Sequence, residues 1–184
     1  MIFSYAITDP QYYGDNPHLL HVSIEKLLCK KVDFICFRDK ESASYELLAQ
    51  SFILTCKDKN FQKSLLHGDV QLACKLRAYG VHLSSKQFSK ISDAKKQGLF
   101  CVVSTHNEEE IHQAMALGAD AVTYSPIFST PNKGIPKGLE DLKEKVAKIN
   151  IKIIALGGII SDKQIAEIES TNAFAFASIR YFID

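Results

Sequence analysis

The sequence has no excess of charge, no long hydrophobic run and no closely spaced pair of cysteines. Its 184 residues carry a formal net charge of +1, whereas proteins that bind nucleic acids or membrane surfaces usually have a basic excess. No apolar run reaches the 18 or so residues that a transmembrane helix needs. We therefore expect neither a nucleic-acid nor a membrane partner. The length fits a single domain over residues 1–184.

The five cysteines are odd in number and widely spaced, and no C-x-x-C motif occurs. This usage predicts reduced thiols in a cytoplasmic protein. The first predicted strand begins at Ile2, so we expect no signal peptide. No H-x-H or H-E-x-x-H spacing occurs, so the histidines do not predict a metal site.

Two hydrophobic patterns alternate along the chain: short apolar runs typical of strands, and segments with helical spacing. Strict alternation predicts parallel strands joined by crossover helices. Eight units close into a single (β/α)8 TIM barrel with a truncated last helix, although about 250 residues are typical of this fold. An open doubly wound sheet is the alternative. The predicted strands are 2–8, 33–37, 64–67, 80–83, 99–105, 119–124, 151–156 and 173–178, and the predicted helices are 18–29, 45–53, 70–76, 89–97, 107–117, 139–149, 161–169 and 179–184.

Glycines and small residues follow the last two predicted strands. Gly157 and Gly158 follow the seventh strand, and Ala177 and Ser178 end the eighth. Glycine lets an anion approach backbone N–H groups closely, and the loops after strands seven and eight are the usual phosphate site of such barrels. These four residues therefore predict a phosphate site, with an ordinary turn as the alternative.

Cationic and polar residues follow strands two and six. Arg38 and Lys40 are two residues apart, so on an extended segment they point the same way and suit a pyrophosphate or a carboxylate. The loop "SPIFSTPNKG" (125–134) carries Thr130, Asn132 and Lys133, which are good partners for phosphate. In both places the alternative is an ordinary solvated loop.

Histidines lie at the same predicted rim. His106 stands where the fifth strand gives way to a helix with Asn107 as its expected N-cap. A histidine can act as acid and base in turn, and the alternative is a helix-start histidine that is hydrogen bonded to backbone. His67 ends a short strand, and His82 is either a rim residue or a core residue with satisfied hydrogen bonds.

Several motifs occur together in an order that identifies a family. They are "YAITD" (5–9), "FRDK" (37–40), "GVHLSS" (80–85), "STHNEEE" (104–110), "GADAVTYSPIFSTPNKG" (118–134) and "IALGGI" (154–159). The chain resembles the superfamily of thiamine phosphate synthase and thiazole tautomerase (TenI) over nearly its whole length. The resemblance implies a (β/α)8 barrel that binds thiazole phosphate. It also implies that His67, Ser104, Thr130 and Lys133 bind substrate with Arg38, Lys40 and Asn132.

The sequence departs from the synthase pattern at the magnesium site. Synthases usually have Q-x-R-x-K on strand two, where Cys36 takes the place of the glutamine here. They also have two carboxylates, one after strand three and one after strand four, that hold magnesium; the matching positions here are Gly68 and Gln87. Asp69 lies one residue away from the first and could partly compensate. Without these ligands a departing pyrophosphate loses its main charge neutraliser.

We therefore expect a thiazole tautomerase, which aromatises thiazole phosphate carboxylate by proton transfer and needs no cofactor. By the resemblance, His106 is its proton carrier. The first alternative is a thiamine phosphate synthase, which would need magnesium. The second is a regulator that binds thiamine phosphates without turnover. The sequence does not indicate the oligomeric state, and a homo-oligomer is compatible with each of these three functions.

Overall fold

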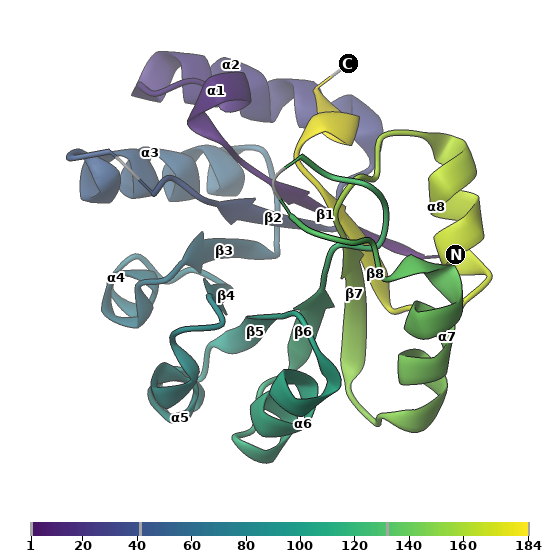
Figure 1. The fold of residues 1–184 in the computed structure, drawn as a ribbon. Helices are drawn as coiled ribbons and strands as arrows, with labels where there is room; N and C mark the ends of the chain where they lie inside the picture. The colour runs from purple at the N-terminus through teal and green to yellow at the C-terminus, as the bar shows by residue number, and fades with distance from the viewer. Residues whose placement is uncertain (1, 41, 132, 184) are drawn as a thin grey trace.

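The computed structural model describes residues 2–40, 42–131 and 133–183, and its eight parallel strands form a closed barrel. Consecutive strands pair, and the barrel closes between the first and the last, with Phe3 beside Ala175 and Ala6 beside Ser178. The prediction of a (β/α)8 barrel is confirmed, and the open sheet is wrong. Figure 1 shows the strands at the centre and the helices around them.

The strands match the predicted ones to within two residues at each end. They are β1 (Phe3–Ile7), β2 (Phe34–Phe37), β3 (Ser64–His67), β4 (Gly80–Leu83), β5 (Phe100–Thr105), β6 (Ala121–Tyr124), β7 (Lys152–Leu156) and β8 (Ala175–Ser178).

The helices follow the strands as expected, and the last one is a single short turn. They are α1 (Pro10–Tyr13), α2 (Pro17–Leu27), η1 (Leu28–Lys30), α3 (Tyr45–Asp58), α4 (Val70–Lys75), η2 (Phe88–Lys90), α5 (Ile91–Lys96), α6 (Glu108–Ala116), α7 (Gly138–Lys148), α8 (Asp162–Glu169) and η3 (Arg180–Phe182). None of the helices within the described ranges is long and apolar enough to cross a membrane.

Side-chain caps begin several of these helices. Asn107 accepts a hydrogen bond from the backbone N–H of Glu110, as the sequence predicts, and Ser161 accepts one from that of Gln164. Helix α1 is not among the predicted helices. Asp9 caps it by accepting from the backbone N–H of Gln11, and Pro10 fits its first position.

An aromatic cluster closes the amino-terminal end of the barrel. Phe34 lies at its centre, only 5% exposed, and its ring centroid is 5.9–6.3 Å from those of five other aromatic rings. The Nζ atom of Lys63 lies 4.5 Å from the centroid of Phe34 and covers the cluster on the solvent side. Aromatic rings therefore fill this end of the barrel.

Phe34→Ala should lower the free energy of unfolding by about 3–5 kcal/mol, because a large buried ring is lost and the neighbouring rings cannot refill its space. Urea unfolding followed by circular dichroism measures this loss. Leu54→Ala is the matched control, because Leu54 is 59% exposed and its truncation should cost less than about 1 kcal/mol. Equal losses of unfolding free energy in the two variants would contradict the packed aromatic cluster, or aromatic floor, at the amino-terminal end of the barrel.

Candidate active site

A cavity of about 960 Å³ opens at the carboxyl ends of the strands. Its walls include almost all the residues that the sequence marked as candidates. These are Arg38, Lys40, His67, Ser104, His106, Thr130, Lys133, Gly157, Gly158, Ala177 and Ser178. Asn132 lies outside the described residues.

The loop between β6 and α7 packs directly on the glycine turn that follows β7. The backbone N–H of Phe128 donates to the carbonyl of Gly157 at 3.0 Å, and that of Ile127 donates to the carbonyl of Leu156 at 2.9 Å. In Figure 1 this loop lies in front of the ends of β1 and β8. Thr130 and Lys133 reach the cavity because the loop is held there.

Both glycines of the turn are required by this close approach. Gly158 has a φ of +71°, and a Cβ there would lie 2.5 Å from the carbonyl oxygen of Ser129. Gly157 has a φ of +103°, and a Cβ there would lie 2.8 Å from Cα of Pro126. The glycine pair therefore has a structural role, because it admits the neighbouring loop, and the phosphate site stays a prediction.

Ser178 ties the last two loops together. Its hydroxyl donates to the carbonyl of Ile159 at 2.7 Å and accepts from the backbone N–H of Tyr181 at 3.2 Å. Within the described ranges, the backbone N–H groups of Gly158, Ile179 and Arg180 have no hydrogen-bond acceptor. All three residues line the cavity, so these N–H groups can receive an anion.

Basic side chains outnumber acidic ones around the cavity. Its described lining contains five basic residues (Arg38, Lys40, Lys86, Lys133 and Arg180) and two acidic ones (Asp39 and Asp69). The Arg38 guanidinium is oriented by an ion pair with Asp9, Nη1 to Oδ2 3.0 Å. The charge of Arg38, partial burial and the charge of Lys133 lower the pKa of Lys40. The cations thus repel one another, and an anion would relieve that repulsion.

Two histidines lie below these cations. Burial, and then the charges of Arg38 and Lys40, lower the pKa of His67 to about 4. Burial, and then His67 and Arg38, lower the pKa of His82 to about 3. His82 is a buried residue with hydrogen bonds at both ring nitrogens, to Tyr5 and Ser104. The core reading of His82 is therefore confirmed, although its ring also borders the cavity.

His106 lies at the cavity rim between β5 and α6. Its Nδ1 is 3.3 Å from both the carbonyl oxygen and the hydroxyl of Ser125. A carbonyl oxygen only accepts, so contact with it places a proton on Nδ1 and leaves Nε2 as the basic nitrogen. The backbone N–H of His106 donates to Glu110 at 2.6 Å.

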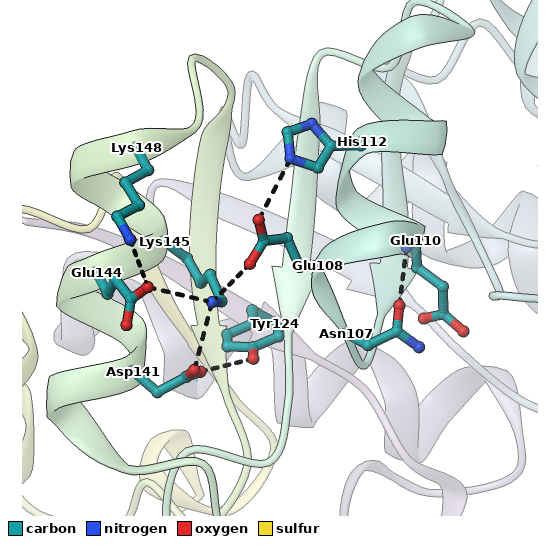
Figure 2. Close-up of polar contacts among 9 residues, drawn as sticks. All are labelled: Asn107, Glu108, Glu110, His112, Tyr124, Asp141, Glu144, Lys145 and Lys148. Carbon is teal, nitrogen blue, oxygen red and sulfur yellow. Dashed lines mark hydrogen bonds and ion pairs between the residues drawn. The ribbon is translucent and has the colours of Figure 1, made fainter.

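An ion-pair cluster fixes the helix that begins beside His106. Figure 2 shows Glu108 at the start of α6 pointing toward Lys145 of α7. The Nζ of Lys145 is 2.7 Å from Glu108 and 3.6 Å from Asp141, and Asp141 accepts from the hydroxyl of Tyr124 at 2.6 Å. Lys145 is 9% exposed, so its contacts are less screened than those of a surface pair.

The residues at the expected magnesium position do not offer paired carboxylates. The Gln87 amide nitrogen donates to the carbonyl of Gly68 at 2.9 Å, and its oxygen accepts from the backbone N–H of Ser84 at 3.0 Å. Asp69 caps α4 by accepting from the backbone N–H of Leu72 at 2.9 Å. Among the described residues no group of three or more His, Cys, Asp or Glu side chains could hold a metal ion. This donor set does not fit the two-carboxylate magnesium site of the synthases.

Sequence reasoning missed several residues of the site. Tyr45 lines the cavity and donates to the backbone carbonyl of His67, whereas Tyr5 contacts the lining residue His82 from inside the barrel. Arg180 reaches the cavity from η3. Only the position of Arg180 just after the eighth strand could have indicated it, because the partners of the two tyrosines lie 77 and 22 residues away.

Comparison with known proteins agrees with the resemblance seen in the sequence. The family model described as thiamine monophosphate synthase matches residues 4–182. "Putative thiamine-phosphate synthase 2" of Aquifex aeolicus is 34% identical over 98% of this chain and 97% of that protein. A thiamine-phosphate synthase of Halalkalibacterium halodurans is 30% identical over 84% of this chain and 75% of that protein.

A solved structure shows the same fold. The chain superposes on a thiamine phosphate pyrophosphorylase from Pyrococcus furiosus with a TM-score of 0.82 and 23% identity, covering 97% of this chain and 85% of that one. At this identity the match supports the barrel alone.

Gly158→Ala should destabilise the protein more than Gly134→Ala. Both glycines have positive φ, +71° and +76°, so either alanine costs about 1–2 kcal/mol of backbone strain. At Gly134 a Cβ would have nothing within 4 Å, whereas at Gly158 it would meet Ser129, which adds about 1–3 kcal/mol of overpacking. Urea unfolding of both variants measures the difference, and equal losses would show that the loop does not pack on the turn.

Stability should fall on acidification because of His67. In the unfolded chain an imidazole binds a proton below about pH 6.5, but in the folded protein His67 binds one only below about pH 4. The unfolded state therefore binds more protons between these values, and folding weakens as pH falls through that window. At pH 5 the cost is about 2 kcal/mol relative to pH 7.5.

His67→Gln should remove the part of this pH-dependent loss of folding stability that is due to His67. Chemical unfolding at pH 7.5 and pH 5 measures it, with the exposed His18→Gln as the control that keeps the full loss. An unchanged pH dependence in His67→Gln would mean that His67 titrates normally.

Proposed function

Since the chain belongs to the thiamine monophosphate synthase family, we propose that it is an enzyme of thiamine biosynthesis that binds a thiazole phosphate in this cavity. The observation that carries the proposal is the convergence of unpaired backbone N–H groups and basic side chains at the mouth of the barrel. The phosphate would lie on the loops that contain Gly158 and Ser178, and Lys133 would face its charge from the loop after β6. Arg38 and Lys40 would hold a second anionic group at the opposite wall.

The reaction that the geometry supports best is proton transfer on the thiazole, the reaction of a thiazole tautomerase. The substrate already carries its phosphate, so the step requires an anchored ring and one group that takes and returns a proton. His106 supplies this group, with Nδ1 oriented by Ser125 and Nε2 free to take the proton. The carboxylate of the thiazole would face Arg38 and Lys40, which suit it because a carboxylate accepts paired hydrogen bonds.

The synthase reaction is the second candidate, and the family and the names of the relatives favour it. It joins a pyrimidine pyrophosphate to the thiazole phosphate, and Arg38 and Lys40 would suit the pyrophosphate. Against it stands the donor set at Gly68 and Gln87, which does not fit magnesium. Without a metal, the leaving pyrophosphate would depend on the basic side chains alone.

Two assays distinguish these reactions. The purified protein is given the non-aromatic thiazole carboxylate phosphate, and separately both phosphorylated precursors with magnesium. Conversion of the first substrate without thiamine phosphate formation from the second supports the tautomerase. Magnesium-dependent thiamine phosphate formation would establish the synthase instead, and binding without either reaction would indicate a regulator.

His106→Asn should lower the single-turnover rate of tautomerisation on the order of 10²–10⁴-fold, because asparagine keeps a hydrogen bond but cannot carry a proton. Its affinity for thiazole phosphate should change little. Lys133→Ala should have the opposite pattern, with weaker binding and a smaller effect on the chemical step. The exposed His18→Asn is the matched control and should behave as the parent. If His106→Asn converts substrate at the parent rate, this histidine is not the proton carrier.

A further inference from the structure

A chain of buried polar groups leads from the interior of the barrel to the cavity wall. The hydroxyl of Tyr5 is 3.0 Å from Nδ1 of His82, and Nε2 of His82 is 3.1 Å from the hydroxyl of Ser104. The three residues come from β1, β4 and β5. Tyr5 and His82 are 1% and 3% exposed, whereas Ser104 is partly exposed and lines the cavity.

The imidazole of His82 is neutral at physiological pH, because burial and its neighbours lower its pKa to about 3. One of its nitrogens therefore donates and the other accepts. Two arrangements are possible. In the first, Tyr5 donates to Nδ1 and Nε2–H donates to Ser104; in the second, every bond is reversed.

The surroundings of Tyr5 decide between them. In the second arrangement the phenolic O–H would need another acceptor, and the other side chain described as interacting with it is the buried Cys36 thiol, a weak acceptor. A buried hydroxyl without a good acceptor is unfavourable, because the hydrogen bond that it made to water is not replaced. In the first arrangement the O–H donates to an imidazole nitrogen and this cost does not arise.

The direction of these bonds determines what Ser104 can offer a ligand. When Ser104 accepts from Nε2–H, its own O–H is free to donate into the cavity; the structure gives this hydroxyl no other partner among the described residues. We propose that Tyr5 and His82 are positioning residues that fix Ser104 as a hydrogen-bond donor. The site would then select a ligand with an acceptor at this point, such as a carboxylate oxygen or an unprotonated ring nitrogen. The identity of that ligand rests on the proposed function, whereas the direction of the hydrogen bonds in the Tyr5–His82–Ser104 relay does not.

The direction of the relay can be measured without a ligand. In ¹⁵N-histidine-labelled protein, with the His82 signals assigned by their loss in His82→Gln, NMR should show the Nε2–H tautomer and no titration between pH 5 and pH 8. The Nδ1–H tautomer, or a titrating His82, would overturn the proposal.

The effect on the ligand is tested by a double-mutant cycle. Calorimetry gives the affinity for thiazole phosphate of the parent, Tyr5→Phe, Ser104→Ala and the double variant. Ser104→Ala should weaken binding about five- to tenfold, the size of one hydrogen bond. Tyr5→Phe should weaken it as well, although Tyr5 does not line the cavity, and should have no further effect once Ser104 is replaced.

Tyr79→Phe is the control, because it removes a tyrosine hydroxyl at the closed end of the barrel. If Tyr5→Phe weakens thiazole phosphate binding equally in the parent and in the Ser104→Ala variant, Tyr5 does not act through Ser104 and the proposal is overturned. If the parent does not bind thiazole phosphate, the proposed function fails, and the tautomer of His82 still decides the relay.

Discussion

The functional end of this molecule depends on one contact, between the loop after β6 and the glycine turn after β7. Two backbone hydrogen bonds hold the loop there, and the absence of side chains at Gly157 and Gly158 lets the two segments touch. The same turn continues to Ile159, whose carbonyl accepts from Ser178 at the end of β8. Three consecutive loops are thus joined into one wall, and the N–H groups that face the cavity belong to that wall.

The opposite wall of the cavity carries basic side chains. The charge of Arg38, partial burial and the charge of Lys133 lower the pKa of Lys40, so these cations repel one another. The fold tolerates this repulsion because the aromatic floor and the buried helical faces stabilise the barrel elsewhere, which is a common compromise at functional sites. An anion between the two walls would interact favourably with the backbone N–H dipoles of one wall and with the positive charges of the other.

The sequence predicted the barrel because each strand and helix has its own hydrophobic period, and because alternation leaves few topologies. It placed the candidate residues at the cavity because the rim of a closed barrel follows directly from where the strands end. The remaining features depend on contacts across the barrel. The approach of Ser129 to Gly158 is set by the path of a loop, and the pairing of Tyr5 with His82 joins strands that are not neighbours. Local patterns carry no information on such distances.

Gln87, at the position where the resemblance implies a carboxylate, makes contacts that a carboxylate could not. The amide both donates to Gly68 and accepts from Ser84, so it joins the loops after β3 and β4. A carboxylate at the same place could accept from Ser84, but it could not donate, and it would face the carbonyl of Gly68 across less than 3 Å. That arrangement is unfavourable unless a cation lies between the two oxygens. As they stand, the two loops are joined by the Gln87 amide, and the Nζ of Lys90 also donates to the carbonyl of Gly68 at 3.3 Å. On the function proposed above, the charge that neutralises a bound anion would come from Arg38, Lys40 and Lys133. On the function proposed above, this arrangement would suit a reaction in which the phosphate stays on the substrate.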